Sequence, residues 1–242
     1  MHFSACVRQD CKGVLNLKWA ELKQAVLLEH GGGKTLFPAD PWTLTWNGPY
    51  LRAVNSPGPQ QIKEFLGAWK ARVKVDTTKV GDALVSLKPY FDALTPFRFE
   101  YVDFGLTIGV GGTAMTVKEV ISKLGDQFDA KTGLRWTATS KALHALLPNL
   151  LVPFDMSIRA GYGCHLPEYT KEFGEDYAKF HLRLKKEADE LVADYCGSTG
   201  CAPADAANEI RSHFYTGAVV PFTRLLDIYN YKKYREGRDE LW

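Results

Sequence analysis

The feature that most constrains the fold is the run from Gly133 to Gly163, GLRWTATSKALHALLPNLLVPFDMSIRAGYG. Its first half places apolar residues at helical spacing until Pro148, which cannot continue a helix. The apolar residues LLVP follow, and Asp155 then stands where the N-cap of another helix is expected. The segment therefore predicts two helices joined by a short extended connection.

Charge is unevenly distributed around this segment. From Lys131 to His165 the chain carries four basic residues and one acid, Asp155. The next stretch, residues 167–195, alternates in sign, which is typical of a solvated helix face. A lone carboxylate in a basic and apolar setting predicts a functional role for Asp155, and the local positive charge permits phosphate binding.

Helical periodicity dominates the rest of the chain. Thr116 and Glu119 form a capping box that predicts a helix reaching about Phe128. Residues 97–104 are interpreted as a short strand or an extended connection. Further helices are expected over residues 16–30, 62–72, 80–91, 168–195, 204–214 and 222–234. Five prolines and several aromatic residues predict a small β element or an aromatic loop within residues 35–60. We expect a mainly α protein, one compact domain over residues 1–242.

Composition excludes several classes of protein. The 242 residues are 45% hydrophobic and 24% charged, with a formal net charge of +2, as in ordinary globular proteins. The first ten residues lack the apolar core of a signal peptide, and no stretch has the length and apolarity of a membrane span. We expect a cytoplasmic monomer without a membrane partner.

Four of the five cysteines form two C-x4-C pairs, one near each end of the chain. The spacing matches neither common zinc sites nor iron–sulfur patterns. Ordinary buried thiols, and hence no cofactor, are the default interpretation. The alternative is a four-thiolate metal site, with ligands Cys6, Cys11, Cys196 and Cys201.

The segment from residue 130 to residue 165 resembles the helix-hairpin-helix DNA glycosylase superfamily. In that family a glycine-containing hairpin opens a helix, and a short extended run leads to a catalytic aspartate that caps the next helix. LVPFDMSI is similar to the family's apolar stretch around that aspartate, which places Asp155 there. The first hairpin glycine falls on Gly133, and Thr137-Ala138 approximates the family's Thr-Ala pair. The resemblance covers about 30 residues.

The segment also departs from the family pattern at two positions. Arg135 stands where the hairpin has its second glycine, and Thr137 stands where bifunctional members carry lysine. The second departure favours a monofunctional, water-using enzyme, although Lys141 one turn later is an alternative lysine. A second glycine-rich piece, TIGVGGTA at residues 107–114, also resembles the hairpin.

The resemblance implies a monofunctional DNA glycosylase that acts on a flipped base in double-stranded DNA. Asp155 would stabilise the oxocarbenium-like sugar and orient water. The further catalytic candidates are Lys141 and His144. Phosphate contacts are expected from the hairpin and nearby residues, Gly133, Arg135, Thr137 and Arg159. Candidates for the base pocket are Trp46, Tyr101, Phe104 and Trp136.

Other interpretations of the same residues remain open. Asp155 could serve only as a helix cap, in a non-catalytic helical DNA-binding module. A helical interaction protein without a nucleic-acid role is a third interpretation. For the glycosylase, the substrate is a modified or damaged base, with host repair at the nucleoid and action on phage DNA both open.

Overall fold

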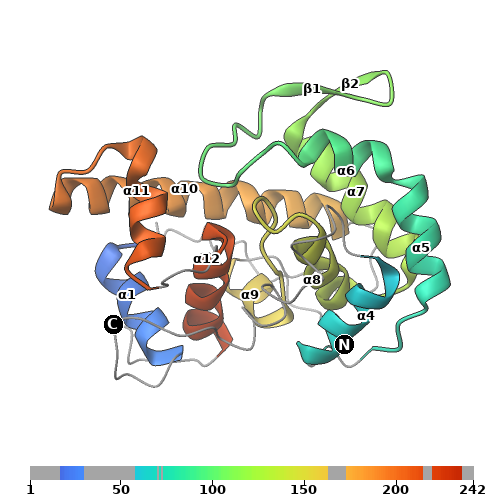
Figure 1. The fold of residues 1–242 in the computed structure, drawn as a ribbon, viewed down its shortest axis with the longest axis horizontal. Helices are drawn as coiled ribbons and strands as arrows, with labels where there is room; N and C mark the ends of the chain where they lie inside the picture. Colours follow the sequence, from blue (N-terminus) through green and yellow to red (C-terminus); the bar gives the residue numbers. More distant parts are fainter. Residues whose placement is uncertain are drawn as a thin grey trace, which may run out of the picture.

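The computed structural model of the protein describes residues 17–29, 58–69, 71, 73–162, 173–214 and 220–235. Within these ranges the chain is mainly helical and contains one two-stranded antiparallel sheet (Figure 1), which confirms the predicted fold class. Residues 35–57, where the small β element was expected, lie outside the described ranges. The described sheet is formed by other residues, 107–116.

Two helices form the centre of the fold. Helix α7 (Val117–Thr132) begins at the predicted capping box, in which Thr116 Oγ1 accepts from the amide of Glu119 and Glu119 Oε2 accepts from the amide of Thr116. It packs along α10 (Phe173–Thr199), which extends from the left edge of the molecule in Figure 1 to beyond its middle. The two backbones meet at Gly174, where a Cβ atom would overlap the carbonyl oxygen of Ser122, so this contact requires glycine.

One group of helices comprises α4 (Pro59–Ala68), α5 (Thr77–Ser86), α6 (Lys88–Leu94) and α8 (Trp136–Leu146). Helices α5, α6 and α8 pack on α7, and α4 packs on α5 and α8. The single helix expected over residues 80–91 is wrong. The chain instead ends α5 and starts α6 around Leu87, since Pro89 lies in the first turn of α6, where a missing N–H is tolerated.

The glycine-rich piece at 107–114 is part of a β-hairpin, β1 (Thr107–Val110) and β2 (Thr113–Thr116). Gly111 and Gly112 both take positive φ, which suits the two-residue turn between paired strands. Its resemblance to a helix-opening hairpin is therefore wrong. Residues 97–104 form turns and irregular connections rather than a strand.

A second group contains α1 (Trp19–Glu29), α11 (Pro203–Ser212) and α12 (Phe222–Asn230), all on the other side of the molecule in Figure 1. The helix expected over 222–234 changes at Tyr231 into a π-helix, η1 (Tyr231–Arg235). The short α9 (Met156–Gly161) lies between the two groups and contacts η1. One continuous hydrophobic cluster joins both groups through α10. In the part of the chain described, no helix is long and apolar enough to cross a membrane.

Candidate active site

The turn between α7 and α8 has two residues with positive φ. Gly133 ends α7 at φ 64°, ψ 24°, and Arg135 precedes α8 at φ 69°, ψ 150°. Arg135 is the one non-glycine residue with positive φ among the residues described. Its backbone thus adopts a conformation that normally requires glycine, at the position where the family hairpin has its second glycine.

The extended run before Asp155 is fixed by hydrogen bonds to two helices. Ser140 Oγ of α8 accepts from the amide of Phe154 at 3.0 Å. From α10, His181 Nε2 accepts from the amide of Val152 at 2.9 Å, and Tyr177 donates to the Val152 carbonyl at 3.0 Å. These bonds satisfy buried backbone groups outside regular structure, and they hold Asp155 at a defined position beside α8.

Asp155 is the N-cap of α9, as the sequence predicts. Its Oδ1 accepts from the amide of Ile158 at 2.9 Å, and only 7% of the residue is exposed. The pattern of an aspartate that caps a helix also occurs at Asp76, the exposed N-cap of α5. Burial is what distinguishes Asp155 from such an ordinary cap.

A second carboxylate, Asp227 of α12, is close enough to Asp155 for the two charges to interact. It is ion-paired with Arg224 one turn earlier. Burial raises the pKa of Asp227, the positive charges of Arg224 and Lys141 oppose this rise, and the negative charge of Asp155 adds to it. The site therefore contains two carboxylates and two cations, contributed by α8, the N-cap of α9 and α12.

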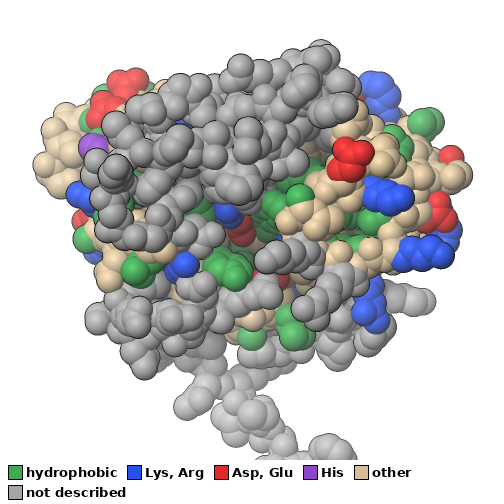
Figure 2. Space-filling view, turned by 60° about the horizontal axis from the view of Figure 1, so that its bottom comes forward, with side chains coloured by type: hydrophobic (Ala, Val, Ile, Leu, Met, Phe, Trp, Pro, Cys, Tyr) green, Lys and Arg blue, Asp and Glu red, His purple; other side chains and the backbone are tan. Residues whose placement is uncertain are grey.

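Trp69, directly after α4, contacts both cations, Lys141 and Arg224. Lys141 Nζ donates to the Trp69 carbonyl oxygen at 3.2 Å and lies 5.3 Å from the centroid of its ring. The guanidinium carbon of Arg224 lies 5.5 Å from the same ring. Both distances are within cation–π range. Figure 2 shows acidic and basic side chains next to one another in a hollow near the middle of the face that it views.

His144 lies in the protein interior, with no exposed surface. Its Nδ1 is 2.5 Å from the carbonyl oxygen of Leu151, and its ring lies 5.9 Å from that of Trp69. Burial lowers the pKa of His144, the hydrogen bond to Leu151 opposes this, the positive charge of Arg224 adds to it, and the resulting pKa is about 3. The imidazole is therefore neutral at physiological pH and ties α8 to the extended run.

The other predicted residues lie in different surroundings. Arg159 is 4% exposed, and its guanidinium stacks 4.5 Å from the ring of Trp136, which is itself buried against Phe173. Gly133 and Arg135 are exposed and Thr137 is half-buried, so these three are accessible at the turn. The structure thus places the residues of the turn between α7 and α8 at the surface, and Arg159 and Trp136 in the core.

The predicted aromatic pocket is not assembled from the residues described. Tyr101 is half-exposed and donates to the carbonyl of Ala204 at 2.8 Å, whereas Phe104 is buried against Phe99 and His181. Trp46 lies outside the described residues. Trp69 is the aromatic residue whose contacts with Lys141 and Arg224 place it at the polar cluster.

Cys196 and Cys201 are free thiols with their sulfur atoms 3.2 Å apart, and Cys6 and Cys11 lie outside the described residues. Across the residues that the structure describes, no group of three or more His, Cys, Asp or Glu side chains could hold a metal ion.

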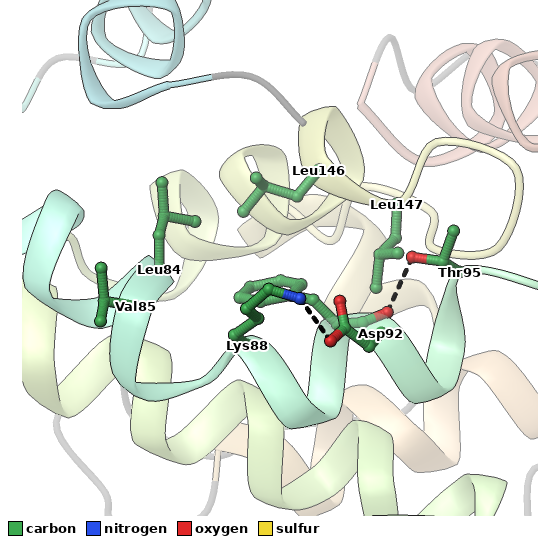
Figure 3. Close-up of a pocket in the computed structure, with 8 residues that line it drawn as sticks. Leu84, Val85, Lys88, Asp92, Thr95, Leu146 and Leu147 are labelled. Carbon is green, nitrogen blue, oxygen red and sulfur yellow. Dashed lines mark hydrogen bonds and ion pairs between the residues drawn. The ribbon is translucent and has the colours of Figure 1, made fainter. Parts of the chain in front are cut away.

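A pocket of about 250 Å³ opens elsewhere, between α5, α6 and the end of α8 (Figure 3). Lys88 and Asp92 form an ion pair at 2.5 Å on one wall, opposite Leu146 and Leu147. None of the predicted site residues lines this pocket, and its acid and base neutralise each other. It contributes nothing to the site around Asp155.

Sequence reasoning missed Trp69, Arg224 and Asp227. A signal for the last two was present, because Arg224 and Asp227 are three residues apart in the apolar sequence PFTRLLDIYN. All nine residues of α12 are buried, so charges within it must be paired. No comparable signal marks Trp69, whose position depends on how α4 packs on α8. Comparisons with protein-family models, curated proteins and solved structures find no match to this chain.

Proposed function

We propose that this protein is a monofunctional DNA glycosylase of helix-hairpin-helix type, with Asp155 as its catalytic carboxylate. The single observation that carries the proposal is the geometry of residues 133–155. The turn before α8 has glycine-like backbone at Gly133 and Arg135, and α8 holds the run that ends at the buried cap Asp155. These are the parts that the sequence resemblance requires, in the required order.

Cleavage of an N-glycosidic bond develops positive charge on the sugar, which a nearby carboxylate stabilises. Asp155 would supply that charge and orient the attacking water. The N-terminus of α8, next to the exposed residues Gly133 and Arg135, would hold a DNA phosphate, with the Arg135 guanidinium adding charge. Trp136 is not proposed as the stacking surface, because it is covered by Arg159 and Phe173.

Lys141 remains in the proposed site as a positioning group. Its ammonium is held by the Trp69 carbonyl and lies near Asp227. Two cations beside two carboxylates leave the local charge balanced. His144 is not proposed as a base, since a pKa of about 3 makes it a weak proton acceptor and its ring is fully buried and tied to Leu151.

The test is the variant Asp155→Asn. Asparagine caps helices about as well as aspartate, so the variant removes the charge while keeping the cap. Asp76→Asn is the matched control, because Asp76 caps α5 in the same way on an exposed helix. Both proteins are incubated with duplexes carrying oxidised, alkylated, mismatched or hypermodified bases and with phage genomic DNAs, and abasic sites are counted.

We expect Asp155→Asn to lose base release by at least about 100-fold, the usual scale of such contributions, with Asp76→Asn unchanged. Full activity of Asp155→Asn would rule out the assignment. Salt-dependent binding to DNA with no abasic product on any substrate would instead favour the non-catalytic DNA-binding module, in which Asp155 only caps α9.

A further inference from the structure

A second buried polar cluster lies where α9, α10, α12 and η1 meet. At its centre is Glu187 of α10, which is 7% exposed. The hydroxyl of Tyr162, the C-cap residue of α9, lies 2.8 Å from Glu187 Oε2 and 2.9 Å from Asn230 Oδ1. No ion pair within the described ranges joins Glu187 directly to a cation. A buried carboxylate without such a partner is strongly disfavoured in its ionised form.

The Tyr162 hydroxyl lies between two oxygen atoms, Glu187 Oε2 and Asn230 Oδ1. A tyrosine hydroxyl carries one proton, and in this arrangement both of the atoms beside it are acceptors if Glu187 is ionised. One of the two contacts would then be a repulsion between oxygens. If Glu187 is protonated, its O–H donates to Tyr162 and Tyr162 donates to Asn230 Oδ1. Protonation therefore satisfies both contacts.

An ionised Glu187 requires a different arrangement. The side-chain amide of Asn230 would turn over, so that Nδ2 donates to Tyr162 and Tyr162 donates to Glu187. Asn230 is completely buried, and its Nδ2 now has no hydrogen-bond partner among the residues described. The turned amide would leave Oδ1 in that position instead. The two protonation states of Glu187 thus correspond to two directions of the same chain of hydrogen bonds.

Charged and titratable groups from every neighbouring element act on Glu187. Lys233 and Tyr234 come from η1, Tyr229 from α12, Glu21 from α1 and Glu190 from α10 itself. Lys233 Nζ donates to the Tyr229 hydroxyl at 2.8 Å, and Arg183 donates to the carbonyl of Tyr162. Burial raises the pKa of Glu187 to about 7, Lys233 opposes this, and the negative charges of Glu190 and Glu21 add to it.

We propose that Glu187 is a positioning residue that holds α9 through Tyr162 when it carries a proton. Helix α9 has six residues, with Asp155 at its N-cap and Tyr162 at its C-cap, so an anchor at Tyr162 acts on the whole helix. The ring of Tyr234 also rests on the backbone of Gly161, which couples η1 to the same end of α9. Loss of the proton leaves an ionised carboxylate buried away from water and requires the buried Asn230 amide to turn over. Both costs are relieved when this end of α9 opens to water, so ionisation of Glu187 loosens it.

The effect on Asp155 as a catalyst rests on the proposed function, but the protonation and the anchoring do not. The experiment therefore reads the helix directly. Amide hydrogen exchange of residues 158–162 is measured in the full chain between pH 5.5 and 8.5, corrected for intrinsic rates, for the wild type and for Glu187→Gln. Glutamine imitates the protonated acid, because its amide can donate to Tyr162. Glu64→Gln, an exposed glutamate of α4, is the control.

We expect protection of α9 in the wild type and in Glu64→Gln to fall as the pH rises through about 7, and to stay constant in Glu187→Gln. The equilibrium constant for unfolding gives a second measure. A folded pKa of about 7 against 4.5 in the unfolded chain predicts that the wild type loses about 150-fold in stability relative to Glu187→Gln between pH 4.5 and 8.

Equal pH dependence of α9 protection in the wild type and Glu187→Gln would overturn the proposal. If Glu187→Gln fails to fold, Tyr162→Phe tests the same anchor, because it removes the hydroxyl that contacts Glu187 and keeps the ring. Its α9 protection is expected to be low and independent of pH, and a wild-type pH profile in that variant would also overturn the proposal. A positive result with no base release from any DNA would count against the proposed function alone.

Discussion

The backbone of Arg135 offers a direct test of the turn before α8. A non-glycine residue at φ 69°, ψ 150° is strained by about 1–3 kcal/mol. Glycine relieves that strain but loses more conformational freedom on folding, which offsets about 0.5–1 kcal/mol. We therefore expect Arg135→Gly to stabilise the protein by about 1 kcal/mol, a rise in Tm of about 2–4 °C for a chain of this size.

The comparison needs a control for the lost side chain. Arg135→Ala removes the guanidinium and keeps the Cβ atom, so the strain remains and no gain is expected. Thermal unfolding of the wild type and both variants at one pH and salt concentration gives the three values. If Arg135→Gly is no more stable than Arg135→Ala, the inference of a strained, glycine-like turn is refuted.

The same variants report on DNA binding if the proposed function holds. A guanidinium that contacts one phosphate contributes about one unit to the slope of log K against log salt concentration. Arg135→Ala and Arg135→Gly should both lower that slope by about this amount. An unchanged slope would show that Arg135 does not contact phosphate.

Two further predictions concern the buried polar groups. His144→Leu leaves the Leu151 carbonyl without its ring partner and should destabilise the protein by about 1–3 kcal/mol. Because a pKa of about 3 keeps His144 neutral in the folded state, whereas the unfolded chain protonates it below about 6.5, wild-type stability relative to this variant should fall as the pH drops from 6.5 towards 3. Urea unfolding at several pH values checks both statements, and a difference that grows above pH 7 would contradict the burial of His144. Asp227→Asn breaks the buried ion pair between Asp227 and Arg224 and should destabilise by about 3–5 kcal/mol. Most of that loss should return in the double variant with Arg224→Met, and additive losses would show that the pair does not interact.

Local sequence signals located most of the helices. The capping box at Thr116 and Glu119 started α7 where predicted, and Asp155 caps α9 as expected, because capping depends on residues within one turn. The predictions were wrong where one local sequence pattern is compatible with two different structures. Two glycines in succession fit a β-turn as well as a helix-opening hairpin, and paired strands decided between them. Pro89 starts a helix as readily as it ends one.

The candidate site was predicted only in part. Asp155, Lys141 and the exposed turn at Gly133 and Arg135 could be located from the sequence, since they lie within one segment of about 25 residues. The burial of Trp136 and Arg159 could not, because it depends on α10 covering this segment.

The sequence by itself determined that the chain is mainly helical and that one carboxylate follows a turn, a helix and a proline. Periodicity, caps and helix breakers act over a few residues, so they can be recognised without the fold. Only the tertiary structure placed Asp227 and Arg224 of α12 near Asp155 and Lys141. It also decided that Glu187 meets Tyr162 and Asn230 away from water. Burial and the charges of distant segments set these properties, and neither is encoded by nearest neighbours in the chain.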